Sequence, residues 1–395
     1  MRTETKLAIG LVFLLCASGQ PAAQDLFVST SGDDSNDCYS WASPCKTIQE
    51  AINRAPGGHA NVFVAAGSYQ EVLDINFQDQ LAILGEPGVE VVPPGDVGNT
   101  LVWVNDSRKV EISDIALRNS GASSGVTGVR IFNSTVGFHG GVVEDFSSGG
   151  IVLHEFSHLR ITNSVIRRNG TYGVRVDDGY HAILSDAVVI EDNTYQGIAM
   201  NGGTVKLSGP VFIRDNNIGI YNRGGRLSGG GELVIGDNTY GVRSRGGYID
   251  IRGPAEISGN SQYGIRVIQG AGILGMYSGT PLTVTGNGTQ GDENTAAIWV
   301  DQNGALDFAN VEVTENPSIG VLATDQSAVS FLWPASITNN GADGVFLDRL
   351  STARITEYAD LTGNHGVDLR CDNGSLASGD KSVIGKMKCA GFINN

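Results

Sequence analysis

The sequence predicts an all-β protein that winds as a solenoid, with three short strands in each coil. Between residues 160 and 370 a short motif with a central asparagine recurs at intervals of 22 to 29 residues. A regular period of this length is typical of repeat proteins, in which each repeat stacks on the next. Within each period, three runs alternate apolar and polar residues and are separated by turn residues such as Gly-Gly. The alternation predicts half-buried strands around one continuous apolar core.

The chain begins with the features of a signal peptide. A basic start precedes an apolar run at residues 7–17, which is too short to span a bilayer. We therefore expect residues 1–23 to be removed and the protein to be secreted or periplasmic. The sequence does not fix the exact cleavage position. Cys16 leaves a lipoprotein anchor as the alternative, although Leu15 before it is bulky for that motif. No later segment has the length and apolarity of a transmembrane helix.

Residues 24–395 are predicted to form one domain. Near its start, residues 46–55 have the pattern of a short helix that would shield the exposed edge of the first coil. Thr47 and Glu50 have the spacing of a capping box, in which each side chain accepts from the other residue's backbone N–H. The apolar face of this helix consists of Ile48, Ala51, Ile52 and Ala55.

Four cysteines remain after the signal peptide, two near each end of the domain. In an exported protein an even number of cysteines suggests disulfides. Proximity in the sequence favours Cys38–Cys45 and Cys371–Cys389, and the second pair would close a C-terminal cap at residues 371–389. A zinc site is the alternative, but a CxxC pair and a neighbouring histidine are absent.

The repeated asparagine has a structural explanation. An asparagine at the same turn of successive coils can adopt a left-handed backbone conformation and hydrogen-bond to its stacked neighbours. We therefore expect a structural ladder rather than a site, formed by Asn169, Asn193, Asn216, Asn238, Asn260, Asn287, Asn316, Asn340 and Asn364.

Three-stranded coils with an asparagine ladder and this period resemble the right-handed parallel β-helix of the pectin-lyase-like superfamily, over about residues 25–395. Gly67, Tyr69 and Glu71 are similar to the GxYxE motif of pectinesterases. The later pectinesterase motifs, the RxPxxR of pectate lyases and the NTD and GHG of polygalacturonases are missing. The resemblance therefore implies the fold and leaves the activity open, because this fold carries lyases, hydrolases, esterases, epimerases and inert rods.

A catalytic group of residues is not evident, so the catalytic residues stay unknown. Coils stack about 4.8 Å apart, which places Asp177 and Asp301 about five coils apart, too far to act as a pair of carboxylates. The six histidines are scattered along the chain. His154 and His158 lie in one coil, but no nucleophile with a third orienting partner accompanies them.

One outer face of the solenoid is the candidate binding surface. Alignment of the strands related to GVRV predicts that Arg223 stacks above Arg245 and Arg243 above Arg266, an arrangement of like charges that repel. The same column is expected to end at Asp368. Arginine with tyrosine and tryptophan suits a ligand with carboxylates or sulfates and flat sugar rings. The predicted ligand-binding residues are Arg175, Tyr221, Arg223, Arg243, Arg245, Arg266 and Trp299. An ordinary solvated surface is the alternative.

The net charge of the chain excludes one class of partner. A net charge of −16 and a pI of 4.7 argue against nucleic-acid binding over the whole surface. From the signal peptide and the arginine-rich face we predict an exported protein that binds extracellular, anionic polysaccharide. In its catalytic form it would be a lyase in which Arg243 or Arg245 assists proton removal. The alternative is a non-catalytic surface, structural or adhesin-like protein. The oligomeric state is left open.

No cofactor and no metal site are expected. The one alternative is calcium bound by the oxygen ligands of Asp33, Asp34 and Asp37, against the reading of these residues as a solvated acidic loop.

Overall fold

The computed structural model describes residues 23–55, 59–95, 98–119, 124–275, 279–289 and 295–394. The predicted signal peptide, apart from its last residue, lies outside the described residues. In the part of the chain that is described, no helix has the length and apolarity needed to cross a membrane.

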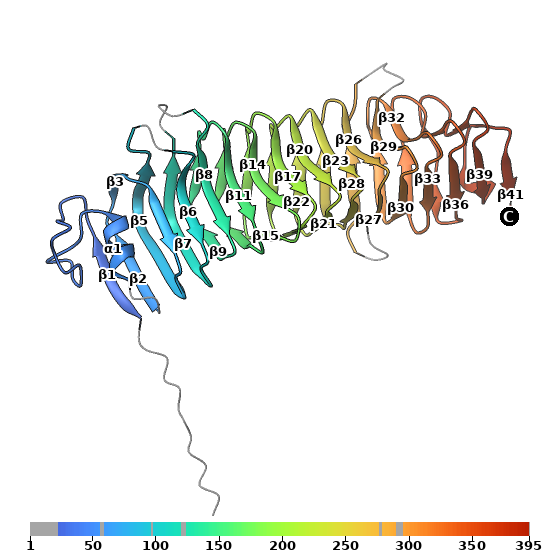
Figure 1. The fold of residues 1–395 in the computed structure, drawn as a ribbon. Helices are drawn as coiled ribbons and strands as arrows, with labels where there is room; N and C mark the ends of the chain where they lie inside the picture. The colour runs from blue at the N-terminus through green and yellow to red at the C-terminus, as the bar shows by residue number, and fades with distance from the viewer. Residues whose placement is uncertain are drawn as a thin grey trace, which may run out of the picture.

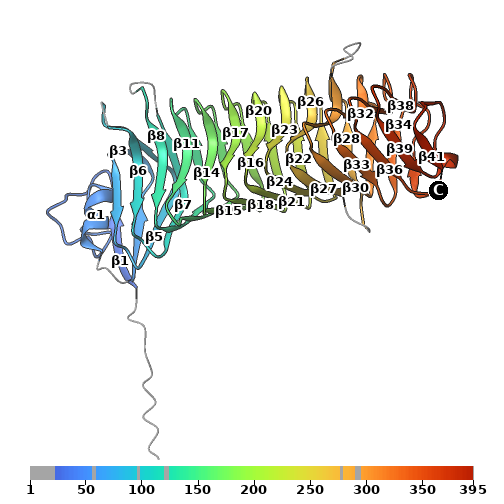
Figure 2. The ribbon, with the colours of Figure 1, turned by 45° about the vertical axis from the view of Figure 1, so that its right-hand side comes forward.

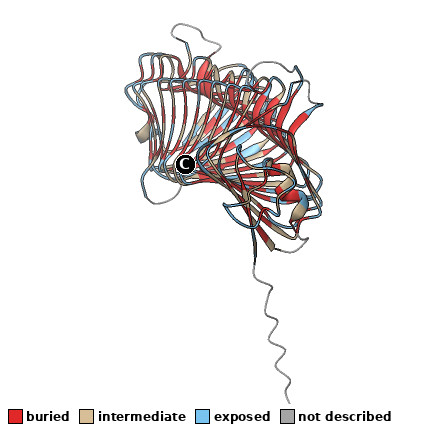
Figure 3. Cartoon of the chain, turned by 90° about the vertical axis from the view of Figure 1, so that its left-hand side faces the viewer, coloured by how far each residue is buried: buried red, intermediate tan, exposed pale blue. Residues whose placement is uncertain are grey.

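The described strands stack into an elongated right-handed solenoid in which all paired strands are parallel (Figures 1 and 2). Each regular coil contributes one strand to each of three sheets. Sheet 1 is separate from the others, whereas sheets 2 and 3 are joined through β5 and β7, which are long enough to pair in both. Buried and more exposed positions alternate along the strands, as Figure 3 shows, so one side of each strand faces the core.

Sheet 1 has 14 strands within the described residues, one from each successive coil. They are β4 (Leu73–Asn76), β6 (Thr100–Asn105), β8 (Thr127–Phe132), β11 (Gly149–His154), β14 (Tyr172–Asp177), β17 (Gln196–Asn201), β20 (Ile218–Arg223), β23 (Tyr240–Arg245), β26 (Tyr263–Ile268), β29 (Ala296–Asp301), β32 (Ile319–Ala323), β35 (Val345–Leu347), β38 (Leu369–Cys371) and β40 (Met387–Cys389).

Sheet 2 continues each coil after a short corner. Its strands are β1 (Gln24–Val28), β2 (His59–Val64), β5 (Gln80–Val92), β7 (Val110–Arg118), β9 (Thr135–His139), β12 (His158–Thr162), β15 (His181–Ser185), β18 (Thr204–Ser208), β21 (Arg226–Gly230), β24 (Tyr248–Ile251), β27 (Ala271–Gly275), β30 (Ala305–Ala309), β33 (Ala328–Phe331), β36 (Thr352–Ile355), β39 (Leu376–Gly379) and β41 (Phe392–Asn394).

Sheet 3 completes the coil and leads into the asparagine turn. Besides the ends of β5 and β7 it contains β3 (Gly67–Gln70), β10 (Val142–Glu144), β13 (Val165–Arg167), β16 (Val188–Glu191), β19 (Val211–Arg214), β22 (Leu233–Gly236), β25 (Ala255–Ser258), β28 (Leu282–Thr285), β31 (Val311–Thr314), β34 (Ala335–Thr338) and β37 (Ala359–Asp360).

The nine predicted asparagines form a continuous buried ladder between sheets 3 and 1. The left-handed residue of each turn is the one before the asparagine, as in Arg168 and Asp192, so the conformation expected for the asparagines themselves is wrong. Each side-chain amide donates to the side-chain oxygen of the asparagine in the next coil at 2.8–3.2 Å. The last amide, of Asn364, donates instead to Asp368 at 2.8 Å. Asp368 is therefore buried at the end of the ladder, and the expectation that it continues the outer column is wrong. The register places Arg370 beside Phe346 in that column.

The N-terminal end is closed by helix α1 (Ile48–Arg54) and by the loop that contains the first disulfide. Glu71 is buried and accepts hydrogen bonds from the backbone N–H groups of Ile48 and Gln49 at 2.9 and 2.7 Å, so it holds the first turn of the helix. Its role here is structural, which explains the GxYxE motif without ester chemistry. The Cys38–Cys45 loop pairs with the outer edge of β1 through Phe27.

The predicted capping box is only half formed. Thr47 accepts from the backbone N–H of Glu50 at 3.2 Å, but its own N–H donates to Asp34. The Glu50 side chain pairs with Arg54 at 2.7 Å instead of reaching back. At the other end of the chain, a disulfide joins the registered residues Cys371 of β38 and Cys389 of β40, next to the short 3₁₀ helix η1 (Lys381–Val383).

Candidate functional site

The outer face of sheet 1 carries two parallel columns of side chains, one residue from each coil. All seven predicted binding residues lie in these columns, because the strand register equals the alignment of the repeats. The middle column contains Asp74, Trp103, Arg130, Val152, Arg175, Ala199, Tyr221, Arg243, Arg266, Trp299, Leu322, Phe346 and Arg370. The edge column contains Phe132, His154, Asp177, Asn201, Arg223, Arg245, Ile268 and Asp301.

Three of the seven residues are held by partners within the protein. The Arg175 guanidinium donates to Asp177 at 2.9 Å, two residues further along the same strand. Arg266 lies 3.8 Å above the centre of the Trp299 ring and donates to the buried Asp301 at 2.6 Å. The ring of Trp299 is thus covered by a cation of its own chain.

Thr324 completes a closed network around Trp299. Its hydroxyl accepts from the indole N–H of Trp299 at 3.1 Å and donates to Asp301 at 3.0 Å. Nη2 of Arg266, the indole N–H and the Thr324 hydroxyl thus have partners within this cluster, whereas the buried Nε of Arg266 has none among the described residues. The prediction that Arg266 and Trp299 face a ligand freely is therefore not supported by the geometry.

Four residues remain available, and we name them the arginine cluster: Tyr221, Arg223, Arg243 and Arg245. Arg223 pairs in register with Arg245, and Tyr221 with Arg243. Arg223 and Arg245 are exposed, and none of the three guanidinium groups forms an ion pair with a described residue. The Nε of Arg243 is buried and lacks a hydrogen-bond partner among the described residues. Unpaired cations stacked in this way repel one another unless an anion binds between them.

Tyrosines flank the arginine cluster. The rings of Tyr240 and Tyr263 are 4.8 Å apart, one coil above the other. Burial raises the pKa of Tyr263 to about 12, although Arg243 and Arg266 oppose the shift, so its phenol stays neutral and cannot serve as the missing anion. The face therefore combines positive charge with aromatic surface.

Charges on sheet 3 are arranged in the opposite way. Down one column, Arg118, Glu144, Arg167, Glu191 and Arg214 alternate from coil to coil. Glu144 is buried and binds two of these arginines at 2.5 and 2.7 Å. Within the described residues, twelve arginines form ion pairs and six do not. Four of those six lie on the outer face of sheet 1, namely Arg130, Arg223, Arg243 and Arg245.

An aromatic stack occupies the N-terminal part of the same face. Phe132 lies between Trp103 and His154, with ring centres 4.6 and 4.5 Å apart. Burial lowers the pKa of His154, and the nearby Arg130 and Arg175 lower it further against the opposing charge of Asp177. His154 is therefore neutral near pH 7 and can accept a proton there. Between this stack and the arginine cluster lies a small buried apolar cluster of Val152, Tyr172 and Ala199.

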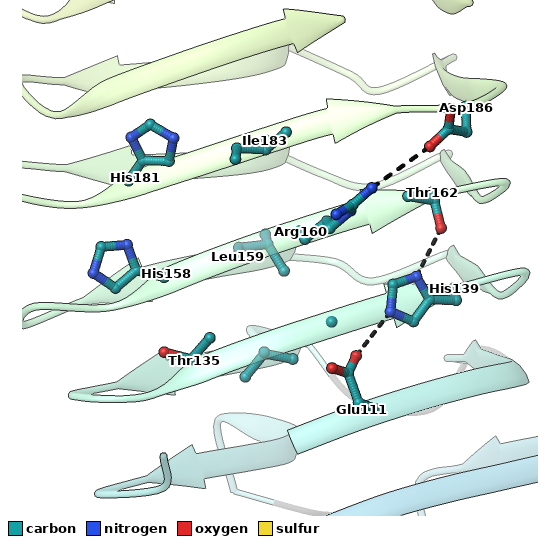
Figure 4. Close-up of a pocket in the computed structure, with 12 residues that line it drawn as sticks. Glu111, Thr135, His139, His158, Leu159, Arg160, Thr162, His181, Ile183 and Asp186 are labelled. Atoms are coloured by element: carbon teal, nitrogen blue, oxygen red, sulfur yellow. Dashed lines mark hydrogen bonds and ion pairs between the residues drawn. The ribbon is translucent and has the colours of Figure 1, made fainter. Parts of the chain in front are cut away.

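Sheet 2 carries a separate hollow of about 470 Å³ (Figure 4). Its floor is Gly137, where a Cβ atom would lie only 1.8 Å from the Glu111 carboxylate. Over this glycine, Glu111 contacts Nε2 of His139 at 2.8 Å, and Nδ1 of the same ring contacts the Thr162 hydroxyl at 2.7 Å. The imidazole is thus held from both sides, which makes this group a hydrogen-bonded structural chain.

Two further histidines line the same hollow. His158 pairs in register with His181, and their ring centres are 6.2 Å apart. Burial lowers the pKa of His181, and the charges of His158 and Lys206 lower it further. The interpretation of the histidines as scattered is wrong for this group. Its signal was available, because His158 and His181, like His139 and Thr162, are 23 residues apart, which is one coil.

The acidic loop considered for calcium uses its carboxylates internally. Asp34 accepts from the backbone N–H groups of Lys46 and Thr47 at 2.8 and 2.9 Å. Asp33 accepts from Ser35, and Asp37 accepts from Tyr39. The described residues contain no group of three or more acidic, histidine or cysteine side chains arranged to hold a metal ion.

The comparisons with known proteins agree with this architecture. Residues 95–240 match a family model described as a right-handed beta helix region. No curated protein matches the sequence. Among solved structures, the A-module of the mannuronan C-5 epimerase AlgE6 from Azotobacter vinelandii is similar with a TM-score of 0.50 and 16% identity, over 84% of this chain and 94% of that one.

Two other solved structures are more distant. The GH136 lacto-N-biosidase from Eubacterium ramulus has a TM-score of 0.35 and 11% identity, over 90% of this chain and 67% of that one. Pectate lyase Pel9A has a TM-score of 0.32 and 12% identity, over 88% and 80%. At these identities the likeness concerns the fold alone. The chain folds as a right-handed parallel β-helix, and the family model covers residues 95–240 of it.

Proposed function

We propose that this protein is exported and binds an anionic extracellular polysaccharide along the outer face of sheet 1. The observation that carries the proposal is the arginine cluster, in which Arg223, Arg243 and Arg245 lie on neighbouring coils without a carboxylate partner among the described residues. A chain of net charge −16 has acidic side chains to spare, and on sheet 3 they neutralise arginines from coil to coil. At the arginine cluster the anion is left to the ligand.

The dimensions of the face suit an extended polymer. Neighbouring strands are about 4.8 Å apart, so Arg223 and Arg245 present donors at that interval along the solenoid axis. Guanidinium groups bind carboxylates and sulfates through paired hydrogen bonds. A chain that lies along the axis, with acidic groups at a similar interval, would meet one arginine at each coil.

Apolar surface continues this path toward the N-terminus. The stack of Trp103, Phe132 and His154 lies on the same face, whereas Val152, Tyr172 and Ala199 between it and the arginine cluster are buried. An aromatic side chain can pack its ring face against the apolar face of a ligand ring while its own edge remains in contact with water. The neighbour at a TM-score of 0.50 is named as an enzyme of mannuronan, which supports a polysaccharide as the class of ligand.

A second candidate function, cleavage of a bound uronate chain by β-elimination, is supported by His154. Its lowered pKa leaves a neutral imidazole near Arg130, which forms no ion pair with a described residue and whose charge would neutralise a sugar carboxylate. In that reaction His154 would take the proton next to the carboxylate, the bond to the leaving sugar oxygen would break, and that oxygen would need a proton from water. His154 replaces Arg243 or Arg245 as the proposed base, because a neutral imidazole accepts a proton far more readily than a guanidinium.

Affinity electrophoresis tests the binding proposal. The mature protein is run in gels that contain polygalacturonate, a sulfated polysaccharide or neutral dextran. We expect salt-sensitive retardation in the polyanion gels, and its loss in Arg243→Ala/Arg245→Ala. Arg354→Ala is the matched control, since Arg354 also lacks an ion pair among the described residues but lies on sheet 2. Equal mobility in all gels would refute the proposal and favour the structural or adhesin-like alternative.

A further inference from the structure

The N-terminal end of the sheet 1 face holds a hollow of about 630 Å³ that the arginine cluster does not reach. It lies where sheet 1 begins, over β4, β6 and β8. Its polar and aromatic lining consists of Asp74, Asn76, Asn99, Thr100, Trp103 and Arg130. Unlike the histidine hollow on sheet 2, it has polar atoms in its lining residues that lack a partner among the described residues.

Two polar atoms in this lining are buried without a partner. Thr100 is only 8% exposed, and its hydroxyl has no hydrogen bond to a described residue. The Nε of Arg130 is also buried and unpaired, while its Nη2 donates to Thr127 at 3.3 Å. An unpaired buried hydroxyl or guanidinium nitrogen destabilises a folded protein, and native proteins contain few of them. Both residues line the hollow, and we expect a ligand bound there to supply the missing partners.

The remaining side chains indicate the kind of ligand. One face of the Trp103 ring is stacked on Phe132, with planes inclined by 20°, and the indole also lines the hollow. Asp74 is exposed and accepts from Asn76 at 2.6 Å, so a carboxylate and an amide are available for hydroxyl groups. Arg130 supplies the only positive charge among the described lining residues. An aromatic surface with one cation, one carboxylate and several neutral polar groups suits an acidic sugar ring.

We infer that this hollow is a second subsite, which binds one uronic acid residue of the same polysaccharide, with its carboxylate toward Arg130 and its ring against Trp103. This inference rests on the proposed function. Trp103 and Tyr221 stand five strand spacings apart in one column, about 24 Å. Only an oligomer long enough to cover this distance can occupy both subsites at once.

Thr100→Val separates a ligand-binding hydroxyl from a structural one. Because the Thr100 hydroxyl has no partner, its removal should leave the thermal midpoint unchanged or raise it, while binding of a decagalacturonide weakens several-fold. The matched control is Thr162→Val, which removes an equally buried hydroxyl that contacts His139. The control should lower the thermal midpoint and leave binding unchanged. A Thr100→Val protein that binds as the wild type does would contradict the inference.

Oligomer length provides the second test, by titration calorimetry with galacturonides of about three and about ten residues. Two linked subsites predict that Trp103→Ala weakens binding of the long oligomer at least tenfold and brings it close to that of the short one. If the wild type binds the long oligomer and Trp103→Ala binds it equally well, the subsite is refuted while the proposed function stands. If the wild type binds neither oligomer nor polymer, the proposed function fails and the subsite with it.

Discussion

Arg223 and Arg245 occupy the same position of neighbouring coils, and neither has a carboxylate partner among the described residues. Two like charges one strand spacing apart, about 4.8 Å, repel each other by nearly 1 kcal/mol even in water. On sheet 3 the corresponding positions alternate in charge, as in Arg167 and Glu191. On sheet 3 the alternating charges stabilise the fold, whereas in the arginine cluster the positive charges stay unpaired.

Removal of one arginine from the cluster should therefore not destabilise the fold. We expect Arg245→Ala to keep the free energy of unfolding or to raise it by a few tenths of a kcal/mol, because it removes a repulsion and no ion pair. Arg167→Ala, which deprives the buried Glu144 of a partner, should lower it by about 1–2 kcal/mol. Chemical denaturation of the two variants compares them. A loss at Arg245 equal to that at Arg167 would show that Arg245 has a structural partner.

Substitution of Glu144 should destabilise the fold more than substitution of one of the arginines that it binds. Glu144→Gln removes the charge shared by Arg118, Arg167 and Arg168 and should lower the free energy of unfolding by about 2–3 kcal/mol. The guanidinium groups are partly exposed, which keeps the loss below that of a fully buried pair. Urea denaturation followed by circular dichroism measures it. A variant as stable as the wild type would mean that water screens this network completely.

Acid should weaken the fold through the same glutamate. Burial opposes ionisation of Glu144, but the hydrogen bond and charge of Arg167, with Arg168 and Arg118, outweigh it and lower its pKa. A lowered carboxyl pKa contributes stability above the unfolded value, and this contribution is lost as the pH falls through the folded value. His154, whose pKa is lowered chiefly by burial, acts in the same direction from about pH 6.5 downward.

Thermal midpoints measured from pH 7 to pH 3 test this dependence. The wild type should lose stability steadily in acid, and Glu144→Gln should lose less, because its residue 144 no longer titrates. Parallel curves for the two proteins would contradict the assignment of this part of the acid response to Glu144.

The asparagine ladder should show the largest losses of any polar substitution. Asn238→Ala leaves its neighbours Asn216 and Asn260 with broken hydrogen bonds in the buried core. We expect a loss of about 2–4 kcal/mol, since buried groups lose their partners on both sides. Asn201→Ala is the control, because Asn201 lies outside the ladder, at the edge of sheet 1, and donates only to Asp177. Equal losses from the two substitutions would exclude a special role of the ladder.

The solenoid, its asparagine ladder and the columns of sheet 1 could be predicted because all three follow from one period. Residues one period apart in the sequence lie one coil apart in space, so Arg223 and Arg245 could be paired by counting. The same counting fails where a turn departs from the repeat. Asp368 lies in such a turn, and the end of the ladder needs an acceptor for Asn364, which draws the aspartate inward.

The state of each arginine could not be predicted, because ion pairs depend on side-chain direction as well as register. Arg266 finds Asp301 across an interval of 35 residues that contains the longest insertion, and its guanidinium settles on Trp299. The repeat pattern records neither contact. The hollow at Thr100 could not be predicted either. Its residues come from coils before residue 160, ahead of the region in which the asparagine motif repeats.

The most direct test of the proposed function is the salt dependence of binding to polygalacturonate by the mature wild-type protein, Arg243→Ala/Arg245→Ala and Arg354→Ala. We predict that the wild type and Arg354→Ala bind with affinities that fall steeply with added salt, because exposed charges are screened within a Debye length. The double variant should bind weakly, with little response to salt. Equal affinity and equal salt dependence of all three proteins would contradict the claim that the arginine cluster binds the polysaccharide.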